Sequence, residues 1–211
     1  MRRRAVRELQ APLRAVASPP ADLIPIRVAR ELAGIAADEI DFALPTHLHR
    51  DHVAGLLDLP ELPVRLHGME RAWAMDGATA PVGGVRAALR GRPVDEYRLD
   101  GPAVLTFPRS HDLLGDGSIV LVDPSGRTPG SVGVLLDTAK GRILVAGDAV
   151  WHTAQLDALR PKPTHPGLLA DDDPRSTLTT LHRLYAVRDR VQILPSHDRD
   201  AATALAGPTS P

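Results

Sequence analysis

Residues 46–56 read THLHRDHVAGL and place four side chains that can bind metal within six positions: His47, His49, Asp51 and His52. The chain has no cysteine, so any metal must be held by histidine and carboxylate, a donor set that suits zinc, manganese or iron. If the extended chain continues through Pro45, His47 and His49 point to the same side, because side chains alternate along a strand. Asp51 and His52 fall in the following turn. The loop therefore predicts two neighbouring cation positions.

Two more candidate ligands follow apolar, strand-like segments later in the chain. RILVAGDAVW leads into Asp148, and VQILPSHD leads into His197. An aspartate at the end of a strand also caps turns, so a structural role for Asp148 is the alternative. The other histidines match no such pattern, and we expect them to be ordinary surface or core residues: His67, His111, His152, His165 and His182.

The elements that must position these residues are strands in two groups, with helices between and after them. Apolar runs predict strands at 40–44, 64–66, 94–99, 104–107, 119–122, 132–136, 143–146 and 191–194. Spacings of three and four predict helices at 24–36, 53–59 and 176–188, the last with Leu178, Leu181, Leu184 and Tyr185 on one face. This order predicts an α/β or α+β layered fold. We expect an unpatterned segment at 1–22, a single domain at 23–206 and a tail at 207–211.

Bulk composition narrows the functional classes. In 211 residues, 43% are hydrophobic and 24% charged, values typical of globular proteins. A formal net charge of −1 argues against nucleic-acid binding. No apolar run approaches a membrane span, and no apolar stretch follows the basic start as in a secretory signal. The prediction is a cytoplasmic protein with no nucleic-acid or membrane partner.

The loop T-H-x-H-x-D-H-x-x-G resembles the signature of the metallo-β-lactamase superfamily, which implies an αββα sandwich with one or two metals at the sheet edges. Such proteins usually begin with a strand pair and a D-T-G turn. Residues 1–39 contain no such turn, so we expect the N-terminal strands to be shortened or missing. The resemblance implies His47, His49 and a third histidine at a first metal. It implies a second metal at Asp51, His52 and His197, with Asp148 shared between the two metals.

The third histidine is missing. The segment SGRTPGSVG resembles the hairpin G-H-T-P-G-S-x-G of the family, but Arg127 stands where histidine is expected. A guanidinium cannot ligate a metal, and two like charges about 4 Å apart repel by a few kcal/mol at moderate effective dielectric. We therefore expect one zinc, held by Asp51, His52, Asp148 and His197, or two if Arg127 turns away.

Three interpretations of Arg127 stay open. The arginine can stand in for the lost metal, facing Asp148 or an anionic substrate. If it turns outward, His47, His49 and Asp148 can form an iron site, as in a dioxygenase. Alternatively, the chain has lost catalysis and acts as a binding protein on the same scaffold.

GDAVWHTAQL and ADDDP look similar to the N-acyl homoserine lactonase-like branch of the family. The resemblance implies hydrolysis of a small-molecule ester, lactone, amide or thioester by a metal-bound hydroxide, with Asp51 orienting the nucleophile and shuttling its proton. Arg127 and Trp151 are the candidate substrate-binding residues; Trp151 stands where lactonases carry a tyrosine. A homodimer is left open.

Overall fold

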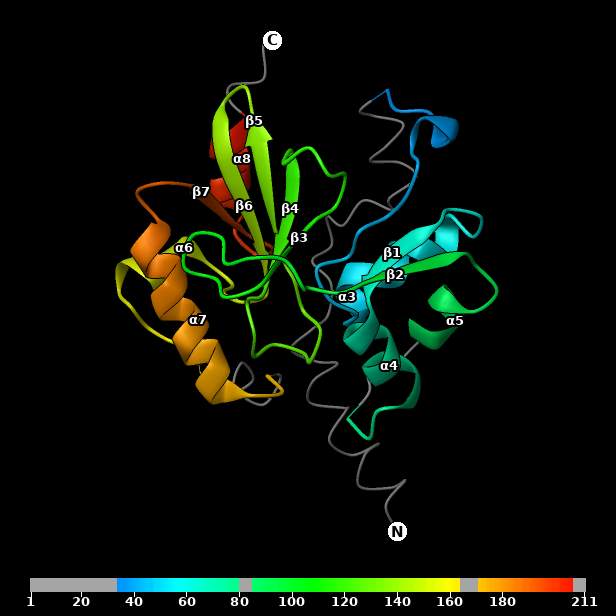
Figure 1. The fold of residues 1–211 in the computed structure, drawn as a ribbon, viewed down its shortest axis with the longest axis horizontal. Coiled ribbons are helices and arrows are strands. Elements are labelled where there is room, and N and C mark those ends of the chain that lie inside the picture. Colours follow the sequence, from blue (N-terminus) through cyan, green and yellow to red (C-terminus); the bar gives the residue numbers. More distant parts are fainter. Residues whose placement is uncertain (1–33, 80–84, 164–170, 207–211) are drawn as a thin grey trace.

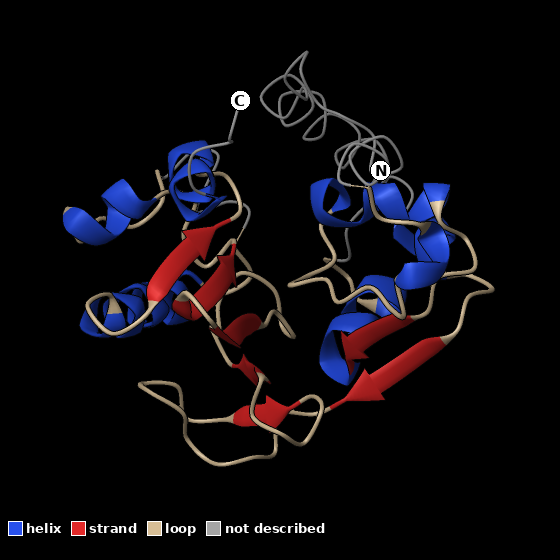
Figure 2. Ribbon diagram, turned by 90° about the horizontal axis from the view of Figure 1, so that it is seen from above, coloured by secondary structure: helices blue, strands red, loops and turns tan. Residues whose placement is uncertain are grey.

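The computed structural model describes residues 34–79, 85–163 and 171–206. Two β-sheets lie between two groups of helices (Figures 1 and 2). The elements in chain order are η1 (Ala37–Glu39), α3 (Arg50–Val53), η2 (Ala54–Asp58), β1 (Val64–His67), α4 (Gly68–Asp76), α5 (Val85–Leu89), β2 (Val94–Tyr97), β3 (Ser110–Asp112), β4 (Ile119–Val122), β5 (Gly133–Thr138), β6 (Gly141–Gly147), α6 (Thr153–Asp157), α7 (Pro174–Val187), β7 (Gln192–Pro195) and α8 (Arg199–Ala206).

The smaller sheet pairs β1 with β2 in parallel, with Val64 opposite Val94. Parallel neighbours need a crossover connection, and α4 and α5 lie in that connection, beside the sheet in Figure 1. Their apolar side chains form one buried cluster with those of α3, η2 and β1: Leu48, Val53, Leu56, Val64, Leu66, Ala74, Val85, Ala88 and Leu89.

The larger sheet has the order β3-β4-β5-β6-β7 and is antiparallel except for the parallel pair β6–β7. The crossover between β6 and β7 carries α6 and α7. One face of the sheet packs against these helices through a cluster that includes Phe107, Leu135, Leu144, Leu156, Leu181, Leu184, Val187 and Ile193.

A third cluster lies between the two halves of the molecule and is built from Tyr97, Leu99, Leu121, Val132 and Val134. The secondary structure therefore forms layers in the order helix, sheet, sheet, helix, and one apolar cluster lies between each pair of neighbouring layers. This confirms the expected α/β sandwich. The predicted domain boundaries stay predictions, and residues 1–33, where the N-terminal strands were expected to be shortened or missing, lie outside the described residues. Within the described residues, no helix is long and apolar enough to cross a membrane.

Two predicted strands are wrong. Residues 40–44 form no strand, since only Ala43 pairs, in a single bridge to Val64, before Pro45 ends the extended segment. Residues 104–107 form a tight turn, in which Val104 and Phe107 bond to each other and Leu105 has a positive φ of 54°. The apolar side chain of Phe107 packs in the core, and this explains why the sequence looks like a strand where no strand forms.

The predicted helices are also corrected. Residues 53–59 are split between α3 and a 3-10 turn, η2. Most of 24–36 lies outside the described residues, and 34–36 are not helical. In α7, Leu178 is 42% exposed. Thr177 and Thr180 are buried there instead, because their hydroxyls donate to the carbonyls of Asp173 and Ser125.

Candidate metal centre

The side chains of the histidine loop alternate between two sides, and this alternation sets which of them reach the candidate metal centre. Leu48 is fully buried in the N-terminal cluster, while the rings of His47 and His49 lie together on the other side, 4.8 Å apart. The amide of Val132 donates to the carbonyl of Thr46 over 2.8 Å and ties the loop to β5. Helix α3 begins immediately after His49 and carries Asp51 and His52. The predicted geometry of this loop is therefore present.

Asp148 and His197 follow the adjacent parallel strands β6 and β7, whose carboxyl ends meet at one edge of the sheet. Gly147, just before Asp148, has φ +55°, and a Cβ there would lie 2.7 Å from Thr46 Oγ1. Only glycine permits this close approach to the histidine loop. The amide of Ser196 donates to the carbonyl of Gly147 and draws the His197 loop to the same point.

One oxygen of Asp148 faces the predicted second metal position. Oδ1 lies 3.2 Å from His52 Nε2 and 3.1 Å from His197 Nε2. Asp51 Oδ2 lies 3.6 Å and 3.7 Å from the same two nitrogens. These atoms converge as ligands of a single ion would.

The residues present fit a divalent cation. Two groups of three, His47 with His52 and Asp148, and Asp51 with His52 and His197, each bring ligand atoms within 4.8 Å of one another. Asp148 Oδ1 and the Nε2 atoms of His47 and His52 are buried with no hydrogen-bond partner among the described residues. Buried polar atoms are rarely left unpaired, and nitrogen and oxygen donors suit zinc and related ions.

The other oxygen of Asp148 faces the predicted first metal position and is already occupied. Arg127 Nη2 lies 2.9 Å from Oδ2, and the Trp151 indole Nε1 donates to the same oxygen over 3.1 Å. His47 Nε2 is farther away, at 3.8 Å. The side chain of Arg127 therefore points into the centre, and both predicted substrate-binding residues contact the shared carboxylate.

His49 stands apart from the other predicted ligands. Its ring lies edge-on to His47 and to Trp73, 5.6 Å from the latter, and it belongs to neither group of three. Its Nδ1 is buried with no hydrogen-bond partner in the part of the chain that the structure describes. Of the six predicted ligands, the structure brings the other five together.

Burial sets the protonation of the centre. It lowers the pKa of His47 well below the usual value and that of His49 to about 3, so both rings are neutral and can donate a lone pair. Contact with the Asp148 carboxylate raises the pKa of His197. Burial opposes ionisation of Asp148, but His197, His52 and His47 together hold its pKa far below the usual range. Asp148 is thus a carboxylate.

Glu70, which sequence reasoning missed, braces the centre from α4. Its Oε1 accepts from the amide of Leu48 over 2.7 Å, and its Oε2 accepts from the amide of Gly130 over 3.0 Å. A Cβ at Gly130 would lie 2.3 Å from the Glu70 nitrogen. This buried carboxylate therefore joins the histidine loop to the loop of Arg127. A glutamate in a first helical turn is usually solvated, so its sequence context gives no signal.

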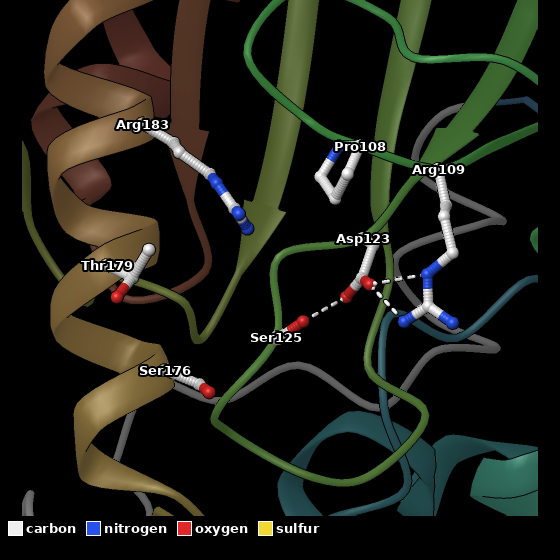
Figure 3. A pocket seen from close by; sticks show the side chains of 7 residues that line it. All are labelled: Pro108, Arg109, Asp123, Ser125, Ser176, Thr179 and Arg183. Carbon is white, nitrogen blue, oxygen red and sulfur yellow. Dashed lines mark hydrogen bonds and ion pairs between the residues drawn. The ribbon is translucent and has the colours of Figure 1, made fainter.

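A second anchor holds the loop that leads to Arg127. Arg109 donates to Asp123 Oδ2 over 3.1 and 2.5 Å, and the hydroxyl of Ser125 donates to Asp123 Oδ1. Figure 3 shows these contacts at the wall of a polar cavity of about 240 Å³ beside α7. Thr180 donates to the carbonyl of Ser125 over 2.8 Å. The route of the chain into Arg127 is therefore fixed from both the sheet and the helix.

Curated relatives of the chain include two probable metallo-hydrolases, from Mycobacterium bovis and Mycobacterium tuberculosis. Each is 28% identical over a stretch that covers 60% of this chain and 42% of the relative. The matched stretch thus spans less than half the length of these relatives.

Solved structures with the same fold include an N-acyl homoserine lactone hydrolase with N-hexanoyl-L-homoserine bound at its catalytic metal centre. Its TM-score is 0.63 at 18% identity, over 83% of this chain and 63% of that one. A quorum-quenching N-acyl homoserine lactone lactonase gives 0.63 at 20% identity, over 85% and 67%. A dizinc quorum-quenching lactonase gives 0.58 at 15% identity, over 81% and 62%. Because the identities are 20% or lower, the likeness to these structures shows only that the fold is shared.

The sequence model of one protein family matches residues 17–197 of the chain, and this range includes every candidate ligand named above. That match covers most of the chain and agrees with the layered fold and with the placing of histidines and aspartates at the strand ends. The chain belongs to the metallo-beta-lactamase superfamily.

Proposed function

We propose that this protein is a metal-dependent hydrolase of a small-molecule ester, lactone, amide or thioester, and that it works with one zinc ion. The division of the Asp148 carboxylate carries the proposal: Oδ1 faces His52 and His197, while Oδ2 is held by Arg127. Membership of the superfamily and the fold shared with lactone hydrolases support the reaction class.

Asp51, His52, Asp148 and His197 would hold the ion. When bound, zinc would supply a Lewis acid and lower the pKa of a water molecule to about 7. Arg127 would take the place of a first metal, because its positive charge lies 2.9 Å from Oδ2 of the same carboxylate. Catalysis in this proposal does not need a second ion.

The exposed side of the centre is where a substrate would enter. The side chains of Asp51 and His197 are 58% and 44% exposed, whereas those of Asp148 and Arg127 are 1% and 7% exposed. Asp51 can therefore accept a proton from an attacking water and pass it to the leaving group. Trp151, at half-buried depth, would form part of the wall against which the substrate lies.

No observation favours the iron-dioxygenase alternative. That site would need Arg127 to turn outward, and its guanidinium is instead 2.9 Å from Asp148. The non-catalytic binding protein shares the whole geometry with the enzyme, so only an assay separates them.

The test is hydrolysis by the zinc-loaded chain of a panel: an N-acyl homoserine lactone, a p-nitrophenyl ester, an anilide and a thioester. His52→Ala is the matched control, because it removes a ligand from both groups of three. Turnover of one substrate class that disappears in the control supports the proposal. Zinc binding without turnover of any class would favour the binding protein, and iron with oxygen uptake would favour the dioxygenase.

A further inference from the structure

Behind the metal centre lies a row of four buried charged side chains, two anions and two cations in alternation. Asp148, Arg127, Asp171 and Lys162 are each less than one-tenth exposed: 2%, 6%, 7% and 2%. The spacings along the row are 2.9 Å from Asp148 to Arg127, 3.5 Å from Arg127 to Asp171 and 2.7 Å from Asp171 to Lys162. Sequence reasoning named the first two as site residues, quoted Asp171 only within the stretch ADDDP, and did not name Lys162.

The row is charge-balanced, and this accounts for its depth. A lone buried ammonium or carboxylate costs several kcal/mol, but paired charges offset this cost. Asp171 Oδ1 accepts from both Arg127 Nη1 and Lys162 Nζ. Lys162 also lies 5.7 Å from the centre of the Trp151 ring, whose indole donates to Asp148. The pair Lys162–Asp171 therefore supports both groups that hold Asp148 Oδ2.

The backbone fixes Asp171 to the segment that carries Arg127. The amide of Asp172 donates to the carbonyl of Arg127 over 3.1 Å, and the amide of Asp173 donates to the carbonyl of Gly126 over 2.9 Å. Because these two hydrogen bonds hold the segments side by side, the Asp171 carboxylate lies beside the guanidinium of Arg127. An arginine side chain loses up to about 2 kcal/mol of rotamer entropy when it is fixed. Because Asp171 is already held in place, it reduces the freedom of the Arg127 side chain to move away from Asp148.

We infer that Lys162 and Asp171 are positioning residues, which hold Arg127 against Asp148 and thereby keep the centre at one metal ion. This inference rests on the proposed one-zinc function. Without the pair, Arg127 would be free to swing away from Asp148, and His47, His49 and Asp148 Oδ2 would become open to a second ion.

Zinc titration by equilibrium dialysis and elemental analysis tests the inference. The key variant is Lys162→Met with Asp171→Asn, which removes one positive and one negative charge together and leaves no unpaired buried ion. The matched control is Lys140→Met with Asp172→Asn, the same two replacements at exposed positions. Both pairs are also made in the Arg127→His background.

The key variant should take up a second zinc at least about tenfold more tightly than the control and the wild type. In the Arg127→His background, the same pair should change the affinity for the second zinc by less than about threefold, because its effect passes through Arg127. If the key variant binds a second zinc no better than the control, the inference is wrong. A purely structural role would change both backgrounds alike, which also overturns it.

The zinc content of the wild-type protein separates this inference from the proposed function. If the wild type already binds two zinc ions, or none, the one-zinc proposal fails whatever the variants do. If it binds one and the key variant matches the control, only the positioning role fails.

A measurement on the unaltered, metal-free chain covers the case of a variant that does not fold. Nitrogen-15 NMR should show resolved, slowly rotating Nη groups of an arginine whose signal disappears in Arg127→His. If Arg127→His removes no slowly rotating Nη signal, the inference is overturned without reference to metal.

Discussion

Arg127 donates to Asp148 at the position where the family resemblance requires a metal–histidine contact. The separation of Nη2 from Oδ2 is 2.9 Å, and both side chains are more than nine-tenths buried. In the proposed one-zinc centre, this salt bridge between side chains takes the place of a metal–carboxylate bond.

Arg127→His should therefore raise the zinc content from about one to about two ions per chain, because it restores a third histidine beside His47 and His49. Arg127→Lys is the control, since it keeps the charge and adds no ligand, and it should stay near one. Elemental analysis after dialysis against excess zinc gives the count. A wild type that holds two ions would show that the charge of Arg127 does not exclude a metal.

Zinc should also stabilise the fold. His52 Nε2 and Asp148 Oδ1 are buried with no hydrogen-bond partner among the described residues, and a bound ion would satisfy both. At zinc concentrations 100 times the dissociation constant, linkage gives about 2.7 kcal/mol, or a rise in Tm of about 5–10 °C for a chain of this size. Differential scanning fluorimetry with zinc and then with a chelator measures it. His52→Ala should abolish the rise; a rise that persists there would place the ion elsewhere.

Asp51 should be needed for turnover more than for metal binding. Three other ligands would remain in Asp51→Asn, so zinc at saturating concentration should still bind. Loss of the group that moves the proton should lower kcat by about 10²–10⁴-fold. Asp58→Asn, an exposed carboxylate in η2, is the control. Equal kcat in Asp51→Asn and wild type, with zinc bound, would remove Asp51 from the catalytic role.

Local signals in the sequence were enough to predict how the side chains of the histidine loop lie and where most strands fall along the chain. His47, His49, Asp51 and His52 lie within one short segment, so their approach follows from local geometry. Asp148 and His197 were predictable because each ends an apolar strand, and parallel strands bring such ends together. The run at 104–107 failed for the opposite reason: Phe107 is apolar because of its place in the core, and periodicity alone cannot distinguish a buried turn from a strand.

The residues that were missed act through tertiary contacts. Glu70 reaches the amides of Leu48 and Gly130, which are 22 and 60 positions away. Lys162 and Asp171 lie in the connection between α6 and α7, and Asp171 meets Arg127 across 44 positions of the chain. No spacing rule joins charges this far apart, and each taken alone has the ordinary appearance of a surface charge.

Glu70→Gln should destabilise the fold in a pH-dependent way. Its amide NH₂ would face a backbone N–H, which leaves buried donors unpaired and costs about 1–3 kcal/mol. Burial is the main cause that raises the pKa of Glu70 above 4.5, against the opposing donors Leu48, Thr128 and Gly130. The folded state therefore binds this proton more tightly than the unfolded state. The contribution of Glu70 is full below about pH 4.5 and falls as pH rises through its folded pKa.

Urea unfolding of wild type and Glu70→Gln between pH 4 and pH 8 measures this difference in free energy, which should be largest at the acid end. Glu61→Gln, at an exposed position, should follow the wild type throughout. A gap between wild type and Glu70→Gln that widens toward pH 8 would contradict the raised pKa.

The loop of Arg127 should depend on glycine at position 126 for two separate reasons. Gly126 has φ +125°, and a Cβ there would lie 2.3 Å from the backbone nitrogen of Thr177 in α7. Gly117 has φ +78° but open space around its Cα. Gly117→Ala should therefore cost only the backbone strain, about 1 kcal/mol, whereas Gly126→Ala adds a collision with backbone and should cost at least about 3 kcal/mol. Because α7 or the loop must move to relieve that collision, Gly126→Ala should also displace Arg127 from Asp148 and allow a second zinc to bind, whereas Gly117→Ala should leave the zinc content unchanged. Chemical denaturation and zinc titration of the two variants side by side give both numbers. Equal losses of stability would mean that the approach of α7 to Gly126 is not close, and the second anchor of the Arg127 loop would then be the Asp123 contacts alone.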